Sequence, residues 1–88
     1  MEIQLLTQDE CAFCDDAMAT LDRLSGEYGL SVTTIQLDGA DGQALAERAG
    51  VMFPPGILID GEPFSYGRLS EKKLRRELER RIGIVRGE

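Results

Sequence analysis

Two cysteines, Cys11 and Cys14, lie two residues apart in the stretch "DECAFCDDA" and are the only thiols in this 88-residue chain. Three kinds of site fit such a pair: a metal site, a structural disulfide and a redox couple. A structural zinc site takes four ligands, and the chain has no histidine, so carboxylates or a second subunit would have to complete it. A disulfide across so short a loop restricts the unfolded chain very little, so stability alone is a poor reason for this spacing. The spacing therefore favours a redox couple.

A redox couple is best placed where its first cysteine begins a helix. There the free backbone N–H groups and the helix dipole stabilise a thiolate. We expect Cys11 to be the exposed nucleophile. Cys14, one helical turn later, should face the core and resolve the mixed disulfide. Such a couple needs no cofactor and no metal beyond its own disulfide.

Four acids surround the pair: Asp9, Glu10, Asp15 and Asp16. Asp15 and Asp16 would fall in the first helical turn, where they stabilise the helix but compete with a thiolate for its positive end. A less stable thiolate makes the reduced form less stable and the couple more reducing. The alternative is that these two residues are helix-start acids without any effect on the couple.

A strand and a helix are predicted to position the cysteines. Glu2–Leu6 is a short apolar run suited to a buried strand. We expect the helix to run from Cys11 to about Tyr28, with Gly29, or Gly26 one turn earlier, at its end. Its apolar residues recur at helical spacing: Cys14, Ala17, Met18, Leu21 and Leu24.

Three further strands follow from composition and turn signals. Leu30–Asp38 is rich in β-branched residues. Gly56–Asp60 and Glu62–Tyr66 flank Gly61 and predict a β-hairpin with a very short connection. Pro63 cannot donate a backbone hydrogen bond, so the last strand belongs at an edge of the sheet.

Two further helices are expected. Asp41 is a plausible N-cap for a short helix through Ala49, which Gly50 would end.

The last helix has its own start signal. Ser70 can cap it, while Leu69 and Leu74 suit a hydrophobic staple. Leu74, Leu78 and Ile82 would form one narrow apolar ridge, with Lys and Arg covering the rest.

The element order is therefore β-α-β-α-β-β-α. Strands separated by helices favour a sheet with a parallel part, closed here by an antiparallel hairpin. We predict an α/β fold with a four-stranded mixed sheet flanked by three helices. One domain should span residues 1–82, with a C-terminal tail at 83–88.

The charge distribution bears on partners. Residues 1–70 carry twelve acids against three bases, and the net charge is −6. Nucleic-acid binding needs a basic footprint, so it is not expected, and the bases near the C-terminus fit a solvated helix face. No apolar run reaches the roughly 18 residues of a membrane span, and no secretory signal is evident. We expect a cytoplasmic monomer.

Two segments besides the cysteines carry a family resemblance: "FPPGILIDG" (Phe53–Gly61) and "GRLSEKKLRREL" (Gly67–Leu78). With the C-x-x-C after a predicted strand, the chain resembles the thioredoxin superfamily, particularly its small glutaredoxin-like members, from Ile3 to about Ile82. The resemblance implies that Pro55 is the cis-proline of this family and that the Pro54–Pro55 peptide bond is cis.

The resemblance also implies a substrate-binding surface. In the family, the cis-proline packs beside the two sulfurs, and the residue before it pairs its backbone with the bound substrate. Transferred to this chain, Ala12 and Phe13 between the cysteines, together with Phe53, Pro54 and Pro55, would face the substrate. Phe13 could instead be a core residue, but its position between the cysteines favours an exposed apolar contact.

Four features depart from glutathione-dependent glutaredoxins. Their lysine before the first cysteine is replaced by Gln8, and Pro54 lacks the N–H that would bond glutathione. "SYGRLS" (Ser65–Ser70) stands where their Gly-Gly-x-x-Asp pattern holds the amino end of glutathione. The four acids around the cysteines would also repel this anionic tripeptide.

Thioredoxin proper is not matched fully either. Its Gly-Pro dipeptide is replaced by Ala12-Phe13, and its buried aspartate corresponds to Leu5. The acceptor of the Cys14 proton is therefore left open between water and one of the flanking carboxylates.

The resemblance implies a thiol–disulfide oxidoreductase acting in electron transport and cell redox homeostasis. We expect it to reduce disulfides of a protein substrate through the Cys11–Cys14 dithiol and to be recycled by a flavoprotein of the thioredoxin-reductase type. The alternatives are a glutathione-dependent glutaredoxin and a carrier that holds a soft metal such as Hg(II), Cu(I) or Zn(II) between its thiols.

Overall fold

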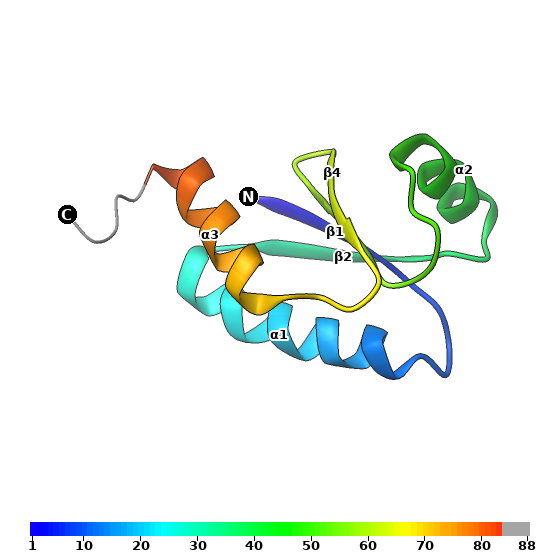
Figure 1. Ribbon diagram of the computed structural model, residues 1–88, viewed down its shortest axis with the longest axis horizontal. Helices are drawn as coiled ribbons and strands as arrows, with labels where there is room; N and C mark the ends of the chain where they lie inside the picture. Colours follow the sequence, from blue (N-terminus) through cyan, green and yellow to red (C-terminus); the bar gives the residue numbers. More distant parts are fainter. Residues whose placement is uncertain (84–88) are drawn as a thin grey trace.

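The structure, a computed structural model, describes residues 1–83 and shows three helices and a four-stranded sheet in that range (Figure 1). The elements follow the predicted order: β1 (Glu2–Thr7), α1 (Ala12–Tyr28), β2 (Ser31–Gln36), α2 (Ala40–Ala49), β3 (Gly56–Ile59), β4 (Glu62–Tyr66) and α3 (Glu71–Ile82). The predicted α/β fold class is confirmed. All elements lie within the expected domain of residues 1–82, and residues 84–88 of the expected tail lie outside the described residues.

The sheet has the strand order β2-β1-β3-β4 and is mixed. β1 pairs in parallel with β2 and antiparallel with β3, and β3 pairs antiparallel with β4. Pro63 lies in the edge strand β4, as its missing donor requires. The register between β3 and β4 shifts after Ile57, so Ser65 pairs with Ile57 while Pro63 pairs with Leu58.

The helices cover the sheet on two faces, with α1 and α3 on one side and α2 on the other (Figure 1). The alternation of side chains along β1 explains this division, because Ile3 and Leu5 point to one face and Leu6 to the other. The larger core cluster joins the sheet to α1 and α3 through Leu21, Leu24, Leu74 and Leu78, among others. The smaller cluster packs α2 against Leu6 and Leu58 through Leu45 and Ala46.

The ends of α1 agree with the sequence prediction. Cys11 is its N-cap, and Gly29 ends it in the left-handed region at φ 68°. Gly26 lies inside the helix, so the earlier end is excluded. Glycine suits the position of Gly29 because it has no Cβ to clash there.

The start of α2 differs from the prediction. Its N-cap is Gly39, which has no side chain to make a cap hydrogen bond, and Asp41 lies in the first turn. Close packing accounts for the shift: a Cβ on Gly42 would lie 1.9 Å from the carbonyl oxygen of Gln36. The first turn of α2 therefore rests directly on the end of β2, and the helix begins before Asp41. The carboxylate of Asp41 still complements the positive end of the helix.

The start of α3 agrees with the prediction, and its end does not. The Ser70 hydroxyl oxygen accepts a hydrogen bond from the Lys73 N–H at 3.3 Å. Leu74 and Leu78 are fully buried, but Ile82 is 45% exposed, so the predicted apolar ridge stops one turn early. Ile82 belongs to the last turn, beyond the core cluster that the two leucines join.

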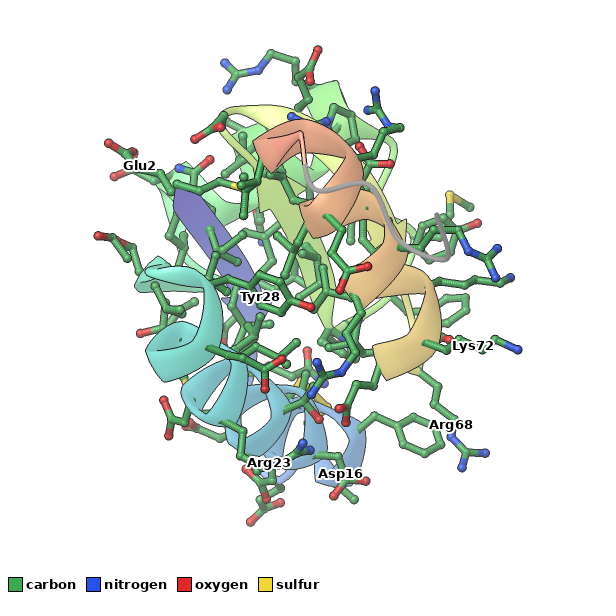
Figure 2. All side chains as sticks on the ribbon, turned by 90° about the vertical axis from the view of Figure 1, so that its left-hand side faces the viewer. Glu2, Asp16, Arg23, Tyr28, Arg68 and Lys72 are labelled. Carbon is green, nitrogen blue, oxygen red and sulfur yellow. A yellow bond between two sulfur atoms is a disulfide. The ribbon has the colours of Figure 1, made fainter. Side chains whose placement is uncertain are left out.

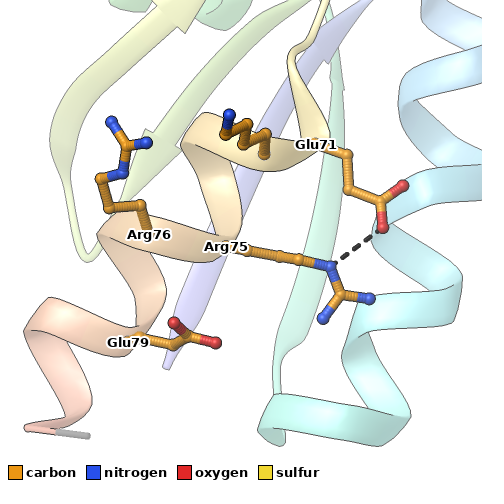
Figure 3. Close-up of a pocket in the computed structure, with 5 residues that line it drawn as sticks. Glu71, Arg75, Arg76 and Glu79 are labelled. Carbon is orange, nitrogen blue, oxygen red and sulfur yellow. Dashed lines mark hydrogen bonds and ion pairs between the residues drawn. The ribbon is translucent and has the colours of Figure 1, made fainter. Parts of the chain in front are cut away.

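Charged side chains tie α3 to α1. Glu71 accepts hydrogen bonds from Arg23 of α1 at 2.9 Å and from Arg75 of its own helix at 3.0 Å, and Figure 3 shows the second of these pairs. Arg75 also pairs with Glu27 of α1. Hydrogen bonds from Arg23 and Arg75 lower the pKa of the Glu71 carboxyl to about 2. The bases of α3 therefore do more than form a solvated face, because some of them fasten the helix to its neighbour.

Candidate redox site

The two cysteines lie at the start of α1 and form a disulfide with a Cα–Cα distance of 5.2 Å. Cys11 is the N-cap residue with extended backbone angles, and its sulfur accepts a hydrogen bond from the Cys14 N–H at 3.1 Å. Its carbonyl oxygen accepts the first helical hydrogen bond, from the Asp15 N–H. The Cys11 sulfur thus lies where the free N–H groups of the helix point, which is the position that stabilises a thiolate after reduction.

The two sulfurs differ in access. Cys14 is only 2% exposed, while Cys11 is partly exposed. One helical turn separates them, so the second cysteine falls on the face of α1 that also carries the buried Ala17 and Leu21. An external disulfide can therefore reach Cys11 but not Cys14. The positions match those expected from the sequence, while their roles in catalysis stay predictions.

A short loop after β1 carries the chain to Cys11. β1 ends at Thr7, whose carbonyl oxygen accepts a hydrogen bond from the Leu37 N–H at 2.7 Å. Glu10, directly before Cys11, has a φ of 55°, in the left-handed region that residues other than glycine rarely adopt. This conformation turns the chain from the strand into the helix and leaves Gln8, Asp9 and Glu10 exposed.

The segment Pro54–Pro55 lies at the same end of the sheet. The peptide bond between the two prolines is cis. Gly56, the next residue, pairs with Leu6 near the end of β1, so the prolines lie beside the strand that leads to Cys11. Pro55 is buried, and its carbonyl oxygen accepts a hydrogen bond from the Gly67 N–H at 2.8 Å. Pro54 is half-buried and has no N–H to offer a ligand.

Large apolar side chains are exposed in the two segments that carry the cysteines and the prolines. Phe13 is 48% exposed and Phe53 is 56% exposed, which excludes the alternative that Phe13 is a core residue. Ala12 is exposed as well. The family resemblance placed five residues at the substrate surface. Four of them are exposed or half-buried, and Pro55 is the one that is fully buried.

The structure adds three residues that the sequence analysis missed. Met52 is exposed directly before Phe53, and the ring of Tyr66 meets that of Phe53 edge to face at 5.1 Å between centroids. Arg68 lies over the Phe13 ring, 6.0 Å from its centroid. The hairpin offered a signal for Tyr66, because antiparallel pairing places the end of β4 opposite Gly56. No comparable signal pointed to Arg68.

Gly67 leaves room for the Phe53 ring beside the turn of the chain that carries Tyr66 and Arg68. Its φ is +80°, and a Cβ there would lie 2.8 Å from a ring carbon of Phe53. Only glycine accepts both the left-handed backbone and the ring at this distance. Phe53, Tyr66 and Arg68 are thereby held around one turn of the chain. We call the exposed side chains of Phe13, Met52, Phe53 and Tyr66 the apolar surface.

No group of three or more His, Cys, Asp or Glu residues within residues 1–83 could hold a metal ion. A metal bound to the two thiols would therefore need ligands other than a third Cys, His, Asp or Glu from this part of the chain. The buried Leu5 occupies the position of the aspartate in thioredoxins, so that strand offers no carboxylate to Cys14.

Comparison with known proteins identifies the family. The glutaredoxin-like domain (DUF836) matches residues 2–79, which is nearly the whole described chain. The chain belongs to this glutaredoxin-like family. Uncharacterised proteins of Mycobacterium bovis and Mycobacterium tuberculosis are 33% identical to it over 82 residues, covering 90% of this chain and 84% of theirs.

Solved structures show the same fold. Thioredoxin 1 from Thermosipho africanus aligns with a TM-score of 0.71 at 16% identity, covering 96% of this chain and 97% of its own. A point mutant of the thioredoxin from Halobacterium salinarum gives a TM-score of 0.69 at 25% identity, covering 90% and 72%. A buckwheat glutaredoxin–glutathione complex gives 0.59 at 21% identity, covering 93% and 70%. A thioredoxin fold with a C-x-x-C pair at a helix start indicates thiol redox chemistry for this member of the family.

Proposed function

We propose that the protein reduces disulfides of protein substrates and receives its electrons from a flavoprotein of the thioredoxin-reductase type. The observation that carries this proposal is the unequal access of the two sulfurs, with Cys11 partly exposed at the N-cap of α1 and Cys14 buried one turn behind it. A dithiol arranged in this way can attack an external disulfide with one sulfur and release it with the other.

The reaction proceeds in two exchanges. In the reduced protein, the Cys11 thiolate attacks one sulfur of the substrate disulfide, forms a mixed disulfide and releases the other substrate sulfur as a thiolate. The Cys14 thiol then loses its proton to water or to a flanking carboxylate and attacks the Cys11 sulfur. The Cys11–Cys14 disulfide forms, and the second substrate thiolate leaves and is protonated. Two electrons and two protons from the reductase restore the dithiol.

The surroundings of the disulfide favour a protein partner over glutathione. Pro54 cannot donate a backbone hydrogen bond to a bound tripeptide, and Gln8 replaces the lysine that glutaredoxins use. Four exposed acids next to the cysteines disfavour an anionic ligand. By contrast, exposed aromatic and Met side chains are typical of the centres of protein–protein interfaces.

Glutathione-dependent reduction is the second candidate. Its support is the family description itself, glutaredoxin-like, together with the structural likeness to the buckwheat glutaredoxin–glutathione complex. In either case we propose a monomer that works in the cytoplasm, where a thiol couple of this kind is kept reduced.

Two coupled assays on the purified protein separate these candidates. One supplies NADPH and thioredoxin reductase, the other NADPH, glutathione and glutathione reductase, with the same protein disulfide as the final acceptor. We expect turnover in the first assay and only background in the second, with Cys11→Ser as the inactive control in both. Robust turnover with glutathione and none with the reductase would overturn the proposed electron source.

A further inference from the structure

We propose that the protein substrates carry lysine or arginine residues next to the disulfide that is reduced. The inference rests on the proposed function, since it concerns the partner of the same Cys11–Cys14 couple. It follows from two features at one end of the molecule: an exposed apolar surface, and acids whose charges have no partner within the described chain.

The apolar surface supplies the contact area. Large hydrophobic side chains exposed within residues 1–83 are Phe13, Met52, Phe53, Tyr66 and Ile82. All except Ile82 belong to the apolar surface. Phe13 lies between the cysteines, and Phe53 precedes the prolines that adjoin the end of β1. The rings of Phe53 and Tyr66 are in contact, and Met52 adjoins Phe53 in the chain. Exposed aromatic and Met side chains of this kind are characteristic of a docking surface.

The acids beside this surface are unpaired. Asp9, Glu10, Asp15 and Asp16 are all exposed, and their carboxylates make no hydrogen bond or ion pair with any of residues 1–83. Elsewhere in the same chain, the carboxylates of Glu71 and Glu77 each bind two arginines. The negative charge of these four acids, at the end of the molecule that carries the disulfide, is thus available to a partner.

Bases on this side of the molecule are fewer and lie toward α3. In the view of Figure 2, Arg68 and Lys72 both point away from the molecule on the side of α3, and Asp16 of α1 appears below them. The guanidinium of Arg68 lies over the Phe13 ring, on the apolar surface itself. Four acids therefore flank the cysteines in sequence, and one base, Arg68, adjoins them through the Phe13 ring. This net negative charge is complementary to a partner with basic residues around its disulfide.

Such charges act mainly on the rate of encounter. Complementary charges around a binding surface raise association rates, and salt reduces the effect because the groups are exposed to solvent. We expect kcat/KM, or the corresponding second-order rate constant, to be about tenfold higher for a basic substrate than for an acidic one at low salt. The preference should fall to about twofold or less near 0.5 M salt.

Three synthetic peptides test the inference. Each closes the same loop with one disulfide, and the residues flanking the two cysteines are lysines, glutamines or glutamates. The pre-reduced full-length protein is mixed with each peptide in a single-turnover reaction, so no reductase or glutathione is needed. We expect rates in the order lysine, glutamine, glutamate, with differences that shrink as salt is added.

Matched variants assign the effect to the acids. Asp15→Asn with Asp16→Asn removes two charges beside the disulfide. Glu2→Gln with Glu47→Gln removes two exposed charges from β1 and α2 (Glu2 lies far from Asp16 in Figure 2). The first double variant should lose at least half of the preference for the lysine peptide, and the second should keep it.

Each other outcome contradicts the inference in a recognisable way. Equal rates for the three peptides would overturn it while leaving the proposed function intact. Preference for the glutamate peptide would overturn it in favour of recognition by Arg68 and Lys72. If none of the peptides were reduced and the protein disulfide of the coupled assay were not reduced either, the proposed function would fail first.

Discussion

Single residues decide which of the two sulfurs is exposed. Cys11 precedes the first turn of α1 and Cys14 belongs to it, so one turn of helix carries the second sulfur from the surface to the core. The difference in exposure follows from helical geometry rather than from any special neighbour. Phe13 lies between them and stays exposed because the same geometry directs it away from the core.

Replacing each cysteine separately should produce different defects. Cys11→Ser should reduce turnover to background, because no accessible nucleophile remains. Cys14→Ser should still attack a substrate disulfide but should accumulate the mixed disulfide, which non-reducing electrophoresis and mass spectrometry detect. If Cys14 of the reduced wild-type protein were alkylated by iodoacetamide before Cys11, the roles would have to be exchanged.

The acids near the start of α1 should make the couple more reducing. Asp15 lies in the first turn as predicted, whereas Asp16, also expected there, follows that turn. A charge near a helix N-terminus is worth about 0.3–1 kcal/mol, and about 1.4 kcal/mol corresponds to 30 mV for a two-electron couple. Asp15→Asn with Asp16→Asn should stabilise the reduced form and raise the reduction potential by about 10–40 mV. Equilibration with a glutathione buffer measures the shift, and Glu2→Gln with Glu47→Gln is the control. An unchanged potential would mean that the two acids serve only the helix.

Among the elements, α1 and α2 use glycine in opposite ways. Gly26 lies inside α1 with no atom within 4 Å of where a Cβ would be, and its φ is not positive. Gly42 lies in the first turn of α2, where a Cβ would lie 3.0 Å from the Cα of Leu37 and closer still to Gln36. Gly26 therefore only lowers the stability of α1, whereas Gly42 is required by the close packing of α2 on β2.

Alanine at these two positions should therefore have effects of opposite sign. Gly26→Ala should increase the free energy of unfolding by roughly 0.5–1 kcal/mol, because alanine loses less backbone entropy on folding. Gly42→Ala should decrease it by about 1–3 kcal/mol, since the backbone of Gln36 has to move. Urea unfolding of both variants measures the changes, and a stabilised Gly42→Ala would contradict the packing of α2 on β2.

Elements whose boundaries depend on local chemistry could be predicted from the sequence. Gly29 ends α1, Ser70 caps α3, and Gly61 lies between the hairpin strands, as the sequence indicated. The start of α2 was missed because contact with β2, a tertiary effect, outweighs the capping preference of Asp41. Ile82 was wrongly assigned to the buried ridge, because helical periodicity does not show where a helix extends beyond the hydrophobic core.

On the scale of the whole molecule, ion pairs hold the last helix against the first. Arg23 and Arg75 lower the pKa of the Glu71 carboxyl from 4.5 to about 2, so the carboxylate is favoured in the folded protein. A carboxyl with a lowered folded-state pKa stabilises the fold above its unfolded-state value. This contribution should be complete above pH 4.5 and should disappear as the pH falls toward 2.

Glu71→Gln should accordingly lower stability at neutral pH but not in acid. The difference in urea midpoint between wild type and variant should be largest near pH 7 and should shrink steadily from about pH 4.5 down to about pH 2. Glu47→Gln, an exposed change on α2, should show no such dependence. A pH-independent difference for Glu71→Gln would indicate lost packing rather than a lost ion pair.

The end of the molecule that carries the disulfide combines three separate parts of the chain: the cysteine segment, the proline segment and the turn at Gly67. Sequence alone therefore could not predict all of its surface residues. The cysteines and the prolines could be recognised because their residue types and order are distinctive. Tyr66 and Arg68 could not, because their place beside Phe53 and Phe13 depends on the hairpin register and on the turn at Gly67. The unpaired state of the acids likewise became visible only when the ion pairs of the other carboxylates were known.

We propose that Cys11 and Cys14 form a reducing dithiol. The reduction potential of the couple tests this, measured by equilibrating the purified protein with glutathione buffers and trapping the free thiols. We expect a potential near that of thioredoxin, about −270 mV or lower. A potential near about −120 mV, the range of a strong oxidant, would contradict it.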